Sequence, residues 1–188
     1  MMIKKGKLVV ISAPSGCGKG TIMKKLFEMD ENNEFVLSVS MTTRSPRGKE
    51  KDGVEYFFVS REHFEELIND NQFIEYAQFN GNYYGTPKPF IEKCIGEGKT
   101  VFLEIEVQGA EMVRNSFPDS ISIFILPPSL EELEKRLKGR QTDDPEVIES
   151  RLAIAPVELA RQNEFNYRVV NDDVERASNE IYNIIKSI

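Results

Sequence analysis

Residues 9–26 read VVISAPSGCGKGTIMKKL, and this stretch decides the fold class of the chain. A short apolar strand, predicted over 8–12, runs into a turn rich in glycine. Lys19 then opens a helix, predicted over 19–29. Glycines let the backbone approach a ligand closely, and the free amide groups of a helix N-terminus attract anions. Together these features predict a loop that binds the phosphates of a di- or triphosphate.

The loop differs from the usual G-x-x-x-x-G-K-[ST] pattern at two positions. Ala13 stands at the first glycine position, and Gly20 stands where a hydroxyl residue normally lies, with Thr21 one residue later. Because Gly20 has no hydroxyl, we expect phosphate oxygens and waters to hold Mg²⁺ instead. The alternative is a glycine-rich turn without a ligand. The predicted phosphate-binding residues are Ala13, Pro14, Ser15, Gly16, Cys17, Gly18, Lys19, Gly20 and Thr21.

The charge and cysteine content exclude several classes of protein. The chain of 188 residues has 24 basic and 31 acidic residues and a net charge of −7. No excess of Lys and Arg is present to neutralise nucleic-acid or membrane phosphates. The two cysteines indicate neither a disulfide framework nor a metal cluster. The apolar run after the first lysines is too short for a signal peptide, and no segment approaches a membrane span. We therefore expect a cytoplasmic protein.

Cys17 lies inside the predicted loop, close to the start of the helix. A helix N-terminus lowers the pKa of a nearby thiol, so a reactive cysteine is the less favoured alternative at this position. The simpler interpretation is a small residue that fills the loop.

Apolar strands alternate with helices along the chain, a pattern typical of an α/β fold with a parallel sheet. Residues 36–86 are rich in strands and indicate an insertion, in which 80–87 is predicted as a loop. Pro156 is expected to kink or divide its helix, because it removes a backbone donor and crowds Leu152. The predicted strands are 8–12, 35–41, 54–60, 73–79, 100–107, 120–126 and 167–171. The predicted helices are 19–29, 61–71, 88–98, 108–115, 129–137, 146–163 and 174–185.

A second set of residues in the insertion is suited to a phosphate monoester. The stretch SVSMTTRSPRGKE, residues 38–50, places Arg44 and Arg47 three residues apart. Tyr56 follows, and GNYYGT at 81–86 supplies Tyr84. Guanidinium groups and phenols all donate hydrogen bonds, so two arginines and two tyrosines favour a bound phosphate.

These motifs together resemble the guanylate kinase family, and the resemblance covers essentially the whole chain. The motifs are the phosphate loop, S-x-S-x-T-T-R-x-P-R, FIEYAQFNGNYYGTP, LEIEVQG, FILPPS, LEKRLKGR and VVNDD. The resemblance implies an α/β fold: a parallel five-stranded P-loop kinase core with helices on both faces, a strand-rich nucleotide-monophosphate-binding insertion and a helical lid. The implied parts are a core of residues 1–35, 87–127 and 156–188, a GMP-binding insertion at 36–86, and a lid at 128–155.

The resemblance also implies substrates and site residues. ATP and Mg²⁺ are expected to act with GMP, and also dGMP, to give ADP and the nucleoside diphosphate. Guanine offers N1–H and the 2-amino group as donors and O6 as an acceptor. A carboxylate and a hydroxyl complement these groups, whereas adenine would place a lone pair against the carboxylate. The residues that match the GMP site are Arg44, Arg47, Tyr56 and Tyr84 for the phosphate, Ser40, Glu75 and Thr86 for the guanine base, and Glu50.

The main departure from the family pattern lies in LEIEVQG, residues 103–109. The family usually has Asp where this chain has Glu106, and Glu104 lies two residues back on the same face of the predicted strand. Either carboxylate is a candidate water-mediated partner of Mg²⁺, and Glu106 is alternatively a contact of the guanine base. In the third interpretation, these carboxylates lie at the end of the strand in contact with solvent and bind no ligand. No protein ligand of the metal is predicted, because ATP phosphates and water carry it.

Three arginines lie in EKRLKGRQTDDPEVIESRL, residues 134–152. The resemblance implies that Arg140 and Arg151 close over the transferred phosphoryl group and are catalytic, together with Lys19 and Arg44. Arg136 is expected to bind ATP, and the alternative is an ion pair with Glu132 at i,i+4.

Asn171 ends the last core strand. It matches the region near the adenine of ATP, and the alternative is a turn residue.

Three other functions share part of this pattern. A GTP-switching protein has a phosphate loop, but the N-K-x-D guanine motif is absent from the sequence. A non-catalytic guanylate-kinase-like binding module lacks a working nucleotide site, whereas Lys19 and the loop glycines are present here. Another nucleoside monophosphate kinase would differ in the base that it accepts. The sequence is compatible with a monomer or a homo-oligomer.

Overall fold

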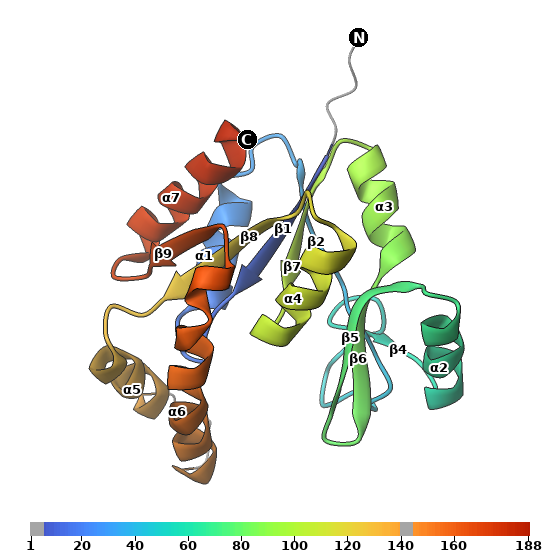
Figure 1. The fold of residues 1–188 in the computed structure, drawn as a ribbon, viewed down its shortest axis with the longest axis horizontal. Coiled ribbons are helices and arrows are strands. Elements are labelled where there is room, and N and C mark those ends of the chain that lie inside the picture. The colour runs from blue at the N-terminus through green and yellow to red at the C-terminus, as the bar shows by residue number, and fades with distance from the viewer. Residues whose placement is uncertain (1–5, 140–144) are drawn as a thin grey trace. The chain divides into compact units, whose positions relative to one another are not determined.

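The computed structural model describes residues 6–139 and 145–188 (Figure 1). Arg140, predicted to be catalytic, lies outside the described residues. The elements in chain order are β1 (Lys7–Ser12), α1 (Lys19–Glu28), β2 (Phe35–Leu37), β3 (Met41–Thr42), β4 (Phe57–Phe58), α2 (Arg61–Asn69), β5 (Phe73–Phe79), β6 (Asn82–Pro87), α3 (Lys88–Gly96), β7 (Thr100–Glu104), α4 (Val107–Ser116), β8 (Ile121–Leu126), α5 (Leu130–Lys138), α6 (Pro145–Ala160), a 3-10 turn η1 (Gln162–Glu164), β9 (Tyr167–Val170) and α7 (Val174–Ser187).

A five-stranded sheet with the order β2-β7-β1-β8-β9 organises the fold. Strand β2 pairs with β7 in parallel, and β8 pairs with β9 in parallel. The central strands β1, β7 and β8 are buried along nearly their whole length, which explains their continuous apolar sequence. The predicted α/β fold with a parallel five-stranded sheet is therefore confirmed.

The chain divides into two compact units. The first comprises Met1–Val9, Glu34–Glu104 and Gln108–Ser120, and the second comprises Val10–Asn33, Ile105–Val107 and Ile121–Ile188. The division into core, insertion and lid with the boundaries given above stays a prediction. None of the helices within the described ranges is long and apolar enough to cross a membrane.

The first unit contains a second sheet, with the order β4-β3-β6-β5. Helix α2 covers it through Phe64, whose ring stacks on Phe73 with centroids 4.3 Å apart and on Tyr83 at 5.1 Å. A Cβ atom at Gly85 would lie 2.9–3.0 Å from Phe73, Phe64 and Tyr76, so glycine permits this close packing. The aromatic cluster fixes the β5–β6 hairpin on its helix.

The second unit packs α1 against α7, the blue and red helices of Figure 1. Their buried side chains include Ile22, Leu26 and Ile181. The hydroxyl of Ser129, the N-cap of α5, accepts a hydrogen bond from the backbone N–H of Glu132 at 3.1 Å.

Several strand boundaries differ from the predictions. Residues 35–41 form two strands in different sheets, because the chain leaves the large sheet after Ser38 donates its N–H to the carbonyl of Phe102 at 2.9 Å. The strand predicted over 54–60 is reduced to β4. The strand predicted over 100–107 ends at Glu104, so Glu106 lies in the connection to α4 rather than on the strand face of Glu104.

The segment 80–87, predicted as a loop, contains strand β6. Asn80 and Gly81 have φ angles of 48° and 76° and connect β5 to β6 as a two-residue hairpin turn. Asn-Gly is a strong signal for this turn, because both positions need a positive φ.

Pro156 lies inside α6, which continues undivided from Pro145 to Ala160. Division of this helix at Pro156 is therefore wrong, and the alternative of a kink at Pro156 stays a prediction. Proline removes only one backbone donor, and the helix already extends from Pro145 to Ala155 before it. Ala155, beside Pro156, is buried and anchors this part of the helix.

Candidate active site

The loop between β1 and α1 presents backbone amide groups at the start of a helix. Gly16 and Gly18 have φ angles of 91° and 81°, which side-chain-bearing residues rarely adopt. The carbonyl of Gly18 accepts bonds from Thr21 and Ile22 at 3.1 Å. Within the described residues, the N–H groups of Gly16, Gly18 and Gly20 donate to no protein acceptor. These amides are therefore available to an anion.

The three glycines differ in their surroundings. A Cβ atom at Gly16 would lie 2.8 Å from Leu137, and one at Gly18 would lie 2.6 Å from Nδ2 of Asn171. A Cβ atom at Gly20 would meet nothing within 4 Å. Glycine is thus required at 16 and 18 by packing, whereas at 20 there is room for a side chain.

Cys17 is buried within this loop, with 1% of its surface exposed. Burial raises the pKa of its thiol to about 12, although the positive charges of Arg136 and Lys19 act in the opposite direction. The alternative of a lowered pKa is therefore wrong, because desolvation of the thiolate outweighs the attraction of the two cations. Cys17 fills the loop as a neutral thiol.

Charged residues of the second unit converge on Lys19. Burial raises the pKa of Glu158, the charge of Glu106 raises it further, and the charge of Lys19 lowers it. Glu158 lies on α6 and was not predicted, because nothing local distinguishes it among 31 acidic residues. Within residues 6–139 and 145–188, no group of three or more His, Cys, Asp or Glu side chains is arranged to hold a metal ion.

Arg136 and Asn171 connect the end of β9 to α5 and to the loop. Arg136 bonds through Nε to Glu132 at 3.1 Å, so the ion pair considered as an alternative is present. Its guanidinium also donates to the carbonyl of Asn171 at 3.1 Å. The amide of Asn171 donates to the carbonyl of Cys17 at 2.7 Å, and the side chain is buried. Arg151, predicted to be catalytic, lies half-buried on α6.

The first unit gathers the arginines and tyrosines predicted to bind a phosphate. Arg44 donates to both carboxylate oxygens of Glu50, at 2.8 and 3.0 Å, and the backbone N–H of Arg47 donates to the same carboxylate at 2.7 Å. These bonds lower the pKa of Glu50. Arg44 lies over the ring of Tyr56 at 5.3 Å, and the rings of Tyr56 and Tyr84 meet edge to face at 6.0 Å.

The residues predicted to read a base lie on the neighbouring strands β5 and β6. Glu75 and Thr86 are register partners, and the Thr86 hydroxyl donates to Oε1 of Glu75 at 2.5 Å. Both side chains are buried. Ser40 is half-buried just before β3, and its carbonyl accepts the N–H of Phe57 at 2.9 Å. The first unit therefore brings one buried carboxylate and one buried hydroxyl together.

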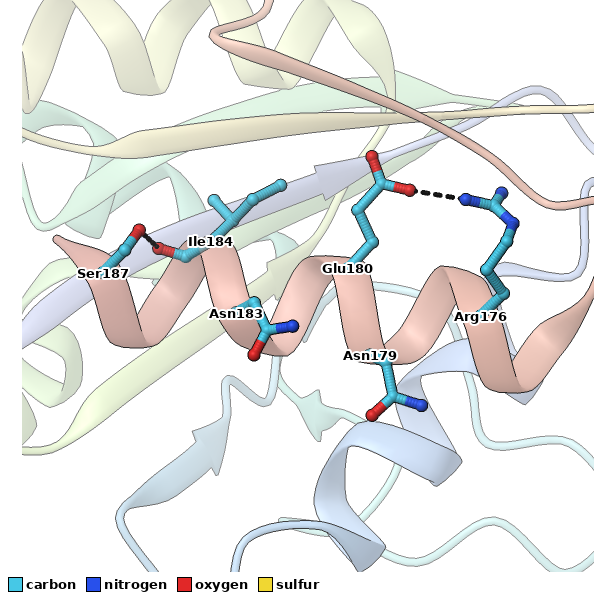
Figure 2. Close-up of a pocket in the computed structure, with 6 residues that line it drawn as sticks. All are labelled: Arg176, Asn179, Glu180, Asn183, Ile184 and Ser187. Atoms are coloured by element: carbon cyan, nitrogen blue, oxygen red, sulfur yellow. Dashed lines mark hydrogen bonds and ion pairs between the residues drawn. The ribbon is translucent and has the colours of Figure 1, made fainter.

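A separate surface pocket lies along α7 (Figure 2). Arg176 and Glu180 form an ion pair across it at 2.7 Å, and Ser187 bonds to the carbonyl of Ile184 at 2.9 Å. None of the predicted site residues lines it. The lining residues are Arg176, Asn179, Glu180, Asn183, Ile184 and Ser187.

Comparison with known protein families shows the family to which this chain belongs. The sequence profile of the family "Guanylate kinase" matches residues 5–188. This chain belongs to the guanylate kinase family. A guanylate kinase of Bacillus cereus is 50% identical over 185 residues, which are 98% of this chain and 90% of that protein.

Solved structures agree with this membership. The crystal structure of the guanylate kinase from Anaplasma phagocytophilum has a TM-score of 0.76 and 34% identity, and the match covers 98% of this chain and 86% of that one. An uncharacterized protein from Eubacterium ventriosum shares the fold, with a TM-score of 0.50 and 18% identity over 98% of this chain and 100% of that one. The resemblance drawn from the motifs and the P-loop kinase fold are confirmed.

Proposed function

We propose that the two units divide the reaction of the guanylate kinase family, in which the γ-phosphate of ATP passes to GMP to give ADP and GDP. The reaction follows from family membership. The second unit is proposed to bind ATP and the first to bind GMP. The observation that carries this assignment is the loop with three free glycine amides at the start of α1, because such amides are a site for phosphate groups.

The ATP phosphates are proposed to bind residues 13–21. The free amides of Gly16, Gly18 and Gly20 would donate to phosphate oxygens, and the Lys19 ammonium would neutralise charge on the β- and γ-phosphates. Phosphoryl transfer depends mainly on alignment and on stabilisation of charge, so groups held rigidly by packing suit it. Cys17 takes no part in proton transfer, since its pKa of about 12 keeps the thiol protonated.

The GMP phosphate is proposed to bind Arg44, Arg47, Tyr56 and Tyr84. Arg44 uses three of its N–H groups on Glu50 and the Ser45 carbonyl, which holds the guanidinium in place. A guanidinium has five such groups, and the remaining ones serve Tyr84, a further hydrogen-bond partner of Arg44, and the proposed phosphate. Glu50 is therefore proposed to orient Arg44 for the phosphate.

Guanine is proposed to be read by Glu75, Thr86 and Ser40. The Glu75 carboxylate would accept from N1–H and the 2-amino group, which adenine cannot offer together. Thr86 donates its single hydroxyl hydrogen to Glu75, so donation to O6 requires this hydrogen to turn away from the carboxylate. The buried carboxylate supports selection of guanine, because adenine would place the lone pair of N1 against it.

Mg²⁺ is proposed to accompany ATP. When bound, it neutralises phosphate charge and orients the phosphates. Two carboxylates near Lys19 are suited to such a cation. The negative charge of Glu106 is one of the causes that raise the pKa of Glu158. A cation placed beside both carboxylates would relieve the repulsion between them. Glu106 and Glu158 would accept hydrogen bonds from waters of the ion, and Glu104 remains the alternative to Glu106.

The arginines of the proposed lid, residues 128–155, would close over ATP. Arg151 is proposed to stabilise charge on the transferred group, with Arg140, outside the described residues, in the same role. Arg136 would contribute positive charge near the loop, since it is held between Glu132 and Asn171. Arginines in this role contribute about 10³–10⁵ in rate in related reactions.

We also propose a cytoplasmic monomer or homo-oligomer with no nucleic-acid or membrane partner. The net charge of −7 and the two free, buried cysteines support this assignment.

The proposed function is tested with a panel of GMP, dGMP, AMP, UMP and dTMP, each with ATP and Mg²⁺, by ADP release. We expect GMP to exceed AMP in kcat/KM by about 10⁴, because the buried carboxylate of Glu75 rejects adenine. A preference for AMP, UMP or dTMP would contradict the base assignment. ADP release without an acceptor, at the rate seen with GMP, would contradict the transfer.

A further inference from the structure

We propose that Asn171 is a positioning residue of the phosphate loop, which holds the peptide between Cys17 and Gly18 so that the N–H of Gly18 is presented to the triphosphate. This proposal rests on the assignment of residues 13–21 to the phosphates of ATP. It differs from the expectation that Asn171 lies near the adenine, because its side chain is engaged by the loop itself.

Asn171 is tied to three parts of the second unit. Its backbone N–H donates to the carbonyl of Leu126 at the end of β8, at 2.8 Å. Its carbonyl accepts from Arg136 at 3.1 Å. Its side-chain amide donates to the carbonyl of Cys17 at 2.7 Å. With 2% of its surface exposed, the residue is anchored on the sheet and reaches the loop from a rigid base.

The bond to Cys17 determines how the next amide points. In a trans peptide the C=O and the N–H both lie in the peptide plane and point in opposite directions across the C–N bond. A carbonyl of Cys17 directed at Asn171 therefore directs the N–H of Gly18 away from Asn171. That N–H donates to no acceptor within the described residues, so it remains available to a phosphate oxygen.

The side chain of Asn171 also lies so close to Gly18 that residue 18 has no room for a side chain. A Cβ atom at Gly18 would lie 2.6 Å from Nδ2 of Asn171, which is closer than such atoms approach each other. The φ angle of 81° at Gly18 is the conformation that allows the carbonyl of Cys17 and the amide of Asn171 to meet. The conformation of the loop and the position of Asn171 therefore depend on each other.

The proposal predicts that Asn171 affects the binding of phosphates whether or not a base is attached. The measurement is calorimetric titration of the unmodified protein, Asn171→Ala and Asn171→Asp with ATP and with inorganic tripolyphosphate. For Asn171→Ala we expect both affinities to fall by the same factor, about tenfold, which corresponds to one hydrogen bond. Asn171→Asp should lose more, because a carboxylate would face the carbonyl of Cys17. The affinity for GMP should not change.

Asn166→Ala is the matched control. The side chain of Asn166 accepts bonds from the N–H and the hydroxyl of Ser122, both at 2.8 Å, in the same unit. This variant should lower Tm and leave the affinity for tripolyphosphate unchanged. If Asn171→Ala does not fold, Asn171→Ser replaces it, because the shorter serine side chain ends before the position of Nδ2 and should lose the bond to Cys17 with the same fall in both affinities.

Three outcomes overturn the proposal. A loss of affinity for ATP with none for tripolyphosphate assigns Asn171 to the adenine. If Asn166→Ala and Asn171→Ala lower Tm equally and also weaken tripolyphosphate binding equally, the effect of Asn171 is one of stability alone. Unchanged binding of both ligands in Asn171→Ala removes the positioning role.

Lys19→Ala separates failure of this proposal from failure of the site on which it rests. If Lys19→Ala binds tripolyphosphate as tightly as the unmodified protein does, the loop is not the phosphate site. If Lys19→Ala loses binding and Asn171→Ala keeps it, the loop assignment stands and only the role of Asn171 fails.

Discussion

Thr86 donates its hydroxyl hydrogen to Oε1 of Glu75 at 2.5 Å, across two paired strands and with both side chains buried. A buried carboxylate is costly unless its oxygens are hydrogen-bonded. The bond also sets the direction of the carboxylate, so the two residues act as one unit in the proposed base site. Changing either residue should therefore alter both stability and selectivity.

The first prediction concerns Glu75→Gln. We expect the preference for GMP over AMP to fall by about 10²-fold or more in kcat/KM, because the new amide brings a donor toward the N1–H of guanine. The kcat at saturating GMP should fall less than kcat/KM. Steady-state kinetics with both acceptors measure the ratio. Thr43→Val is the control, since the hydroxyl of Thr43, directly after β3, accepts the N–H of Tyr83 at 2.9 Å. An unchanged GMP:AMP ratio in Glu75→Gln would remove Glu75 from base reading.

The second prediction concerns pH and the Arg44–Glu50 pair. The pKa of Glu50 lies below its ordinary value in the folded protein, because Arg44 and the N–H of Arg47 stabilise the carboxylate. Its contribution to stability is therefore complete above about pH 4.3, the unfolded value, and is lost as the pH falls through the lowered folded pKa. The difference in Tm between the unmodified protein and Glu50→Gln should be present at pH 7 and shrink below pH 4.

Glu50→Gln should also raise the KM for GMP by about tenfold, because Arg44 loses the charge-assisted hydrogen bonds that hold its guanidinium in place. Glu65→Gln, which removes an exposed pair with Arg61 at 3.5 Å, should change neither KM nor Tm appreciably. A Tm difference for Glu50→Gln that grows as the pH is lowered toward 3 would reverse the sign expected here.

The third prediction is that neither cysteine reacts in the folded protein. Both thiols are buried, and burial raises the pKa of each, that of Cys17 to about 12. Since the thiolate is the reactive form, an aromatic disulfide reagent at pH 8 should modify no thiol before unfolding and both thiols in urea. Rapid reaction of one thiol in the native protein would show that the loop is open. Cys17→Ala identifies which thiol it is.

Much of this structure could be predicted from local sequence. The central strands are apolar runs because both faces are buried, and the glycine-rich turn after β1 lies within a few residues of Lys19. The start of α5 was also predicted, because the cap is formed by neighbours in the chain, Ser129 and Glu132. Such features depend on residues close in sequence, and they were predicted correctly.

The features that were missed depend on long-range packing. The bond from Asn171 to Cys17 joins residues 154 positions apart, and no local pattern indicates it. The raised pKa of Cys17 and the position of Glu158 near Lys19 come from elements that meet only in the folded unit. Strand β6 is different: its Asn80-Gly81 turn was visible in the sequence, and its positive φ angles follow from those two residue types.

The last prediction compares Gly18→Ala with Gly20→Ala. At Gly18 the φ angle is 81° and the new Cβ would lie 2.6 Å from Nδ2 of Asn171, so both backbone strain and a clash follow. We expect a loss of about 1–3 kcal/mol in the free energy of unfolding and at least tenfold weaker ATP binding. At Gly20 the space is open, and α1 begins at Lys19.

Gly20→Ala should therefore retain ATP binding and gain up to about 1 kcal/mol in the free energy of unfolding, because alanine favours a helix over glycine. Urea unfolding and ATP titration measure both effects. The comparison is matched, since each variant adds one methyl group to the same loop. If Gly20→Ala weakened ATP binding as much as Gly18→Ala does, the prediction would be contradicted, because only the Cβ atom at residue 18 meets Asn171. In the double variant Gly18→Ala with Asn171→Ala, the clash is removed and only the strain at Gly18 remains, so part of the lost stability should return.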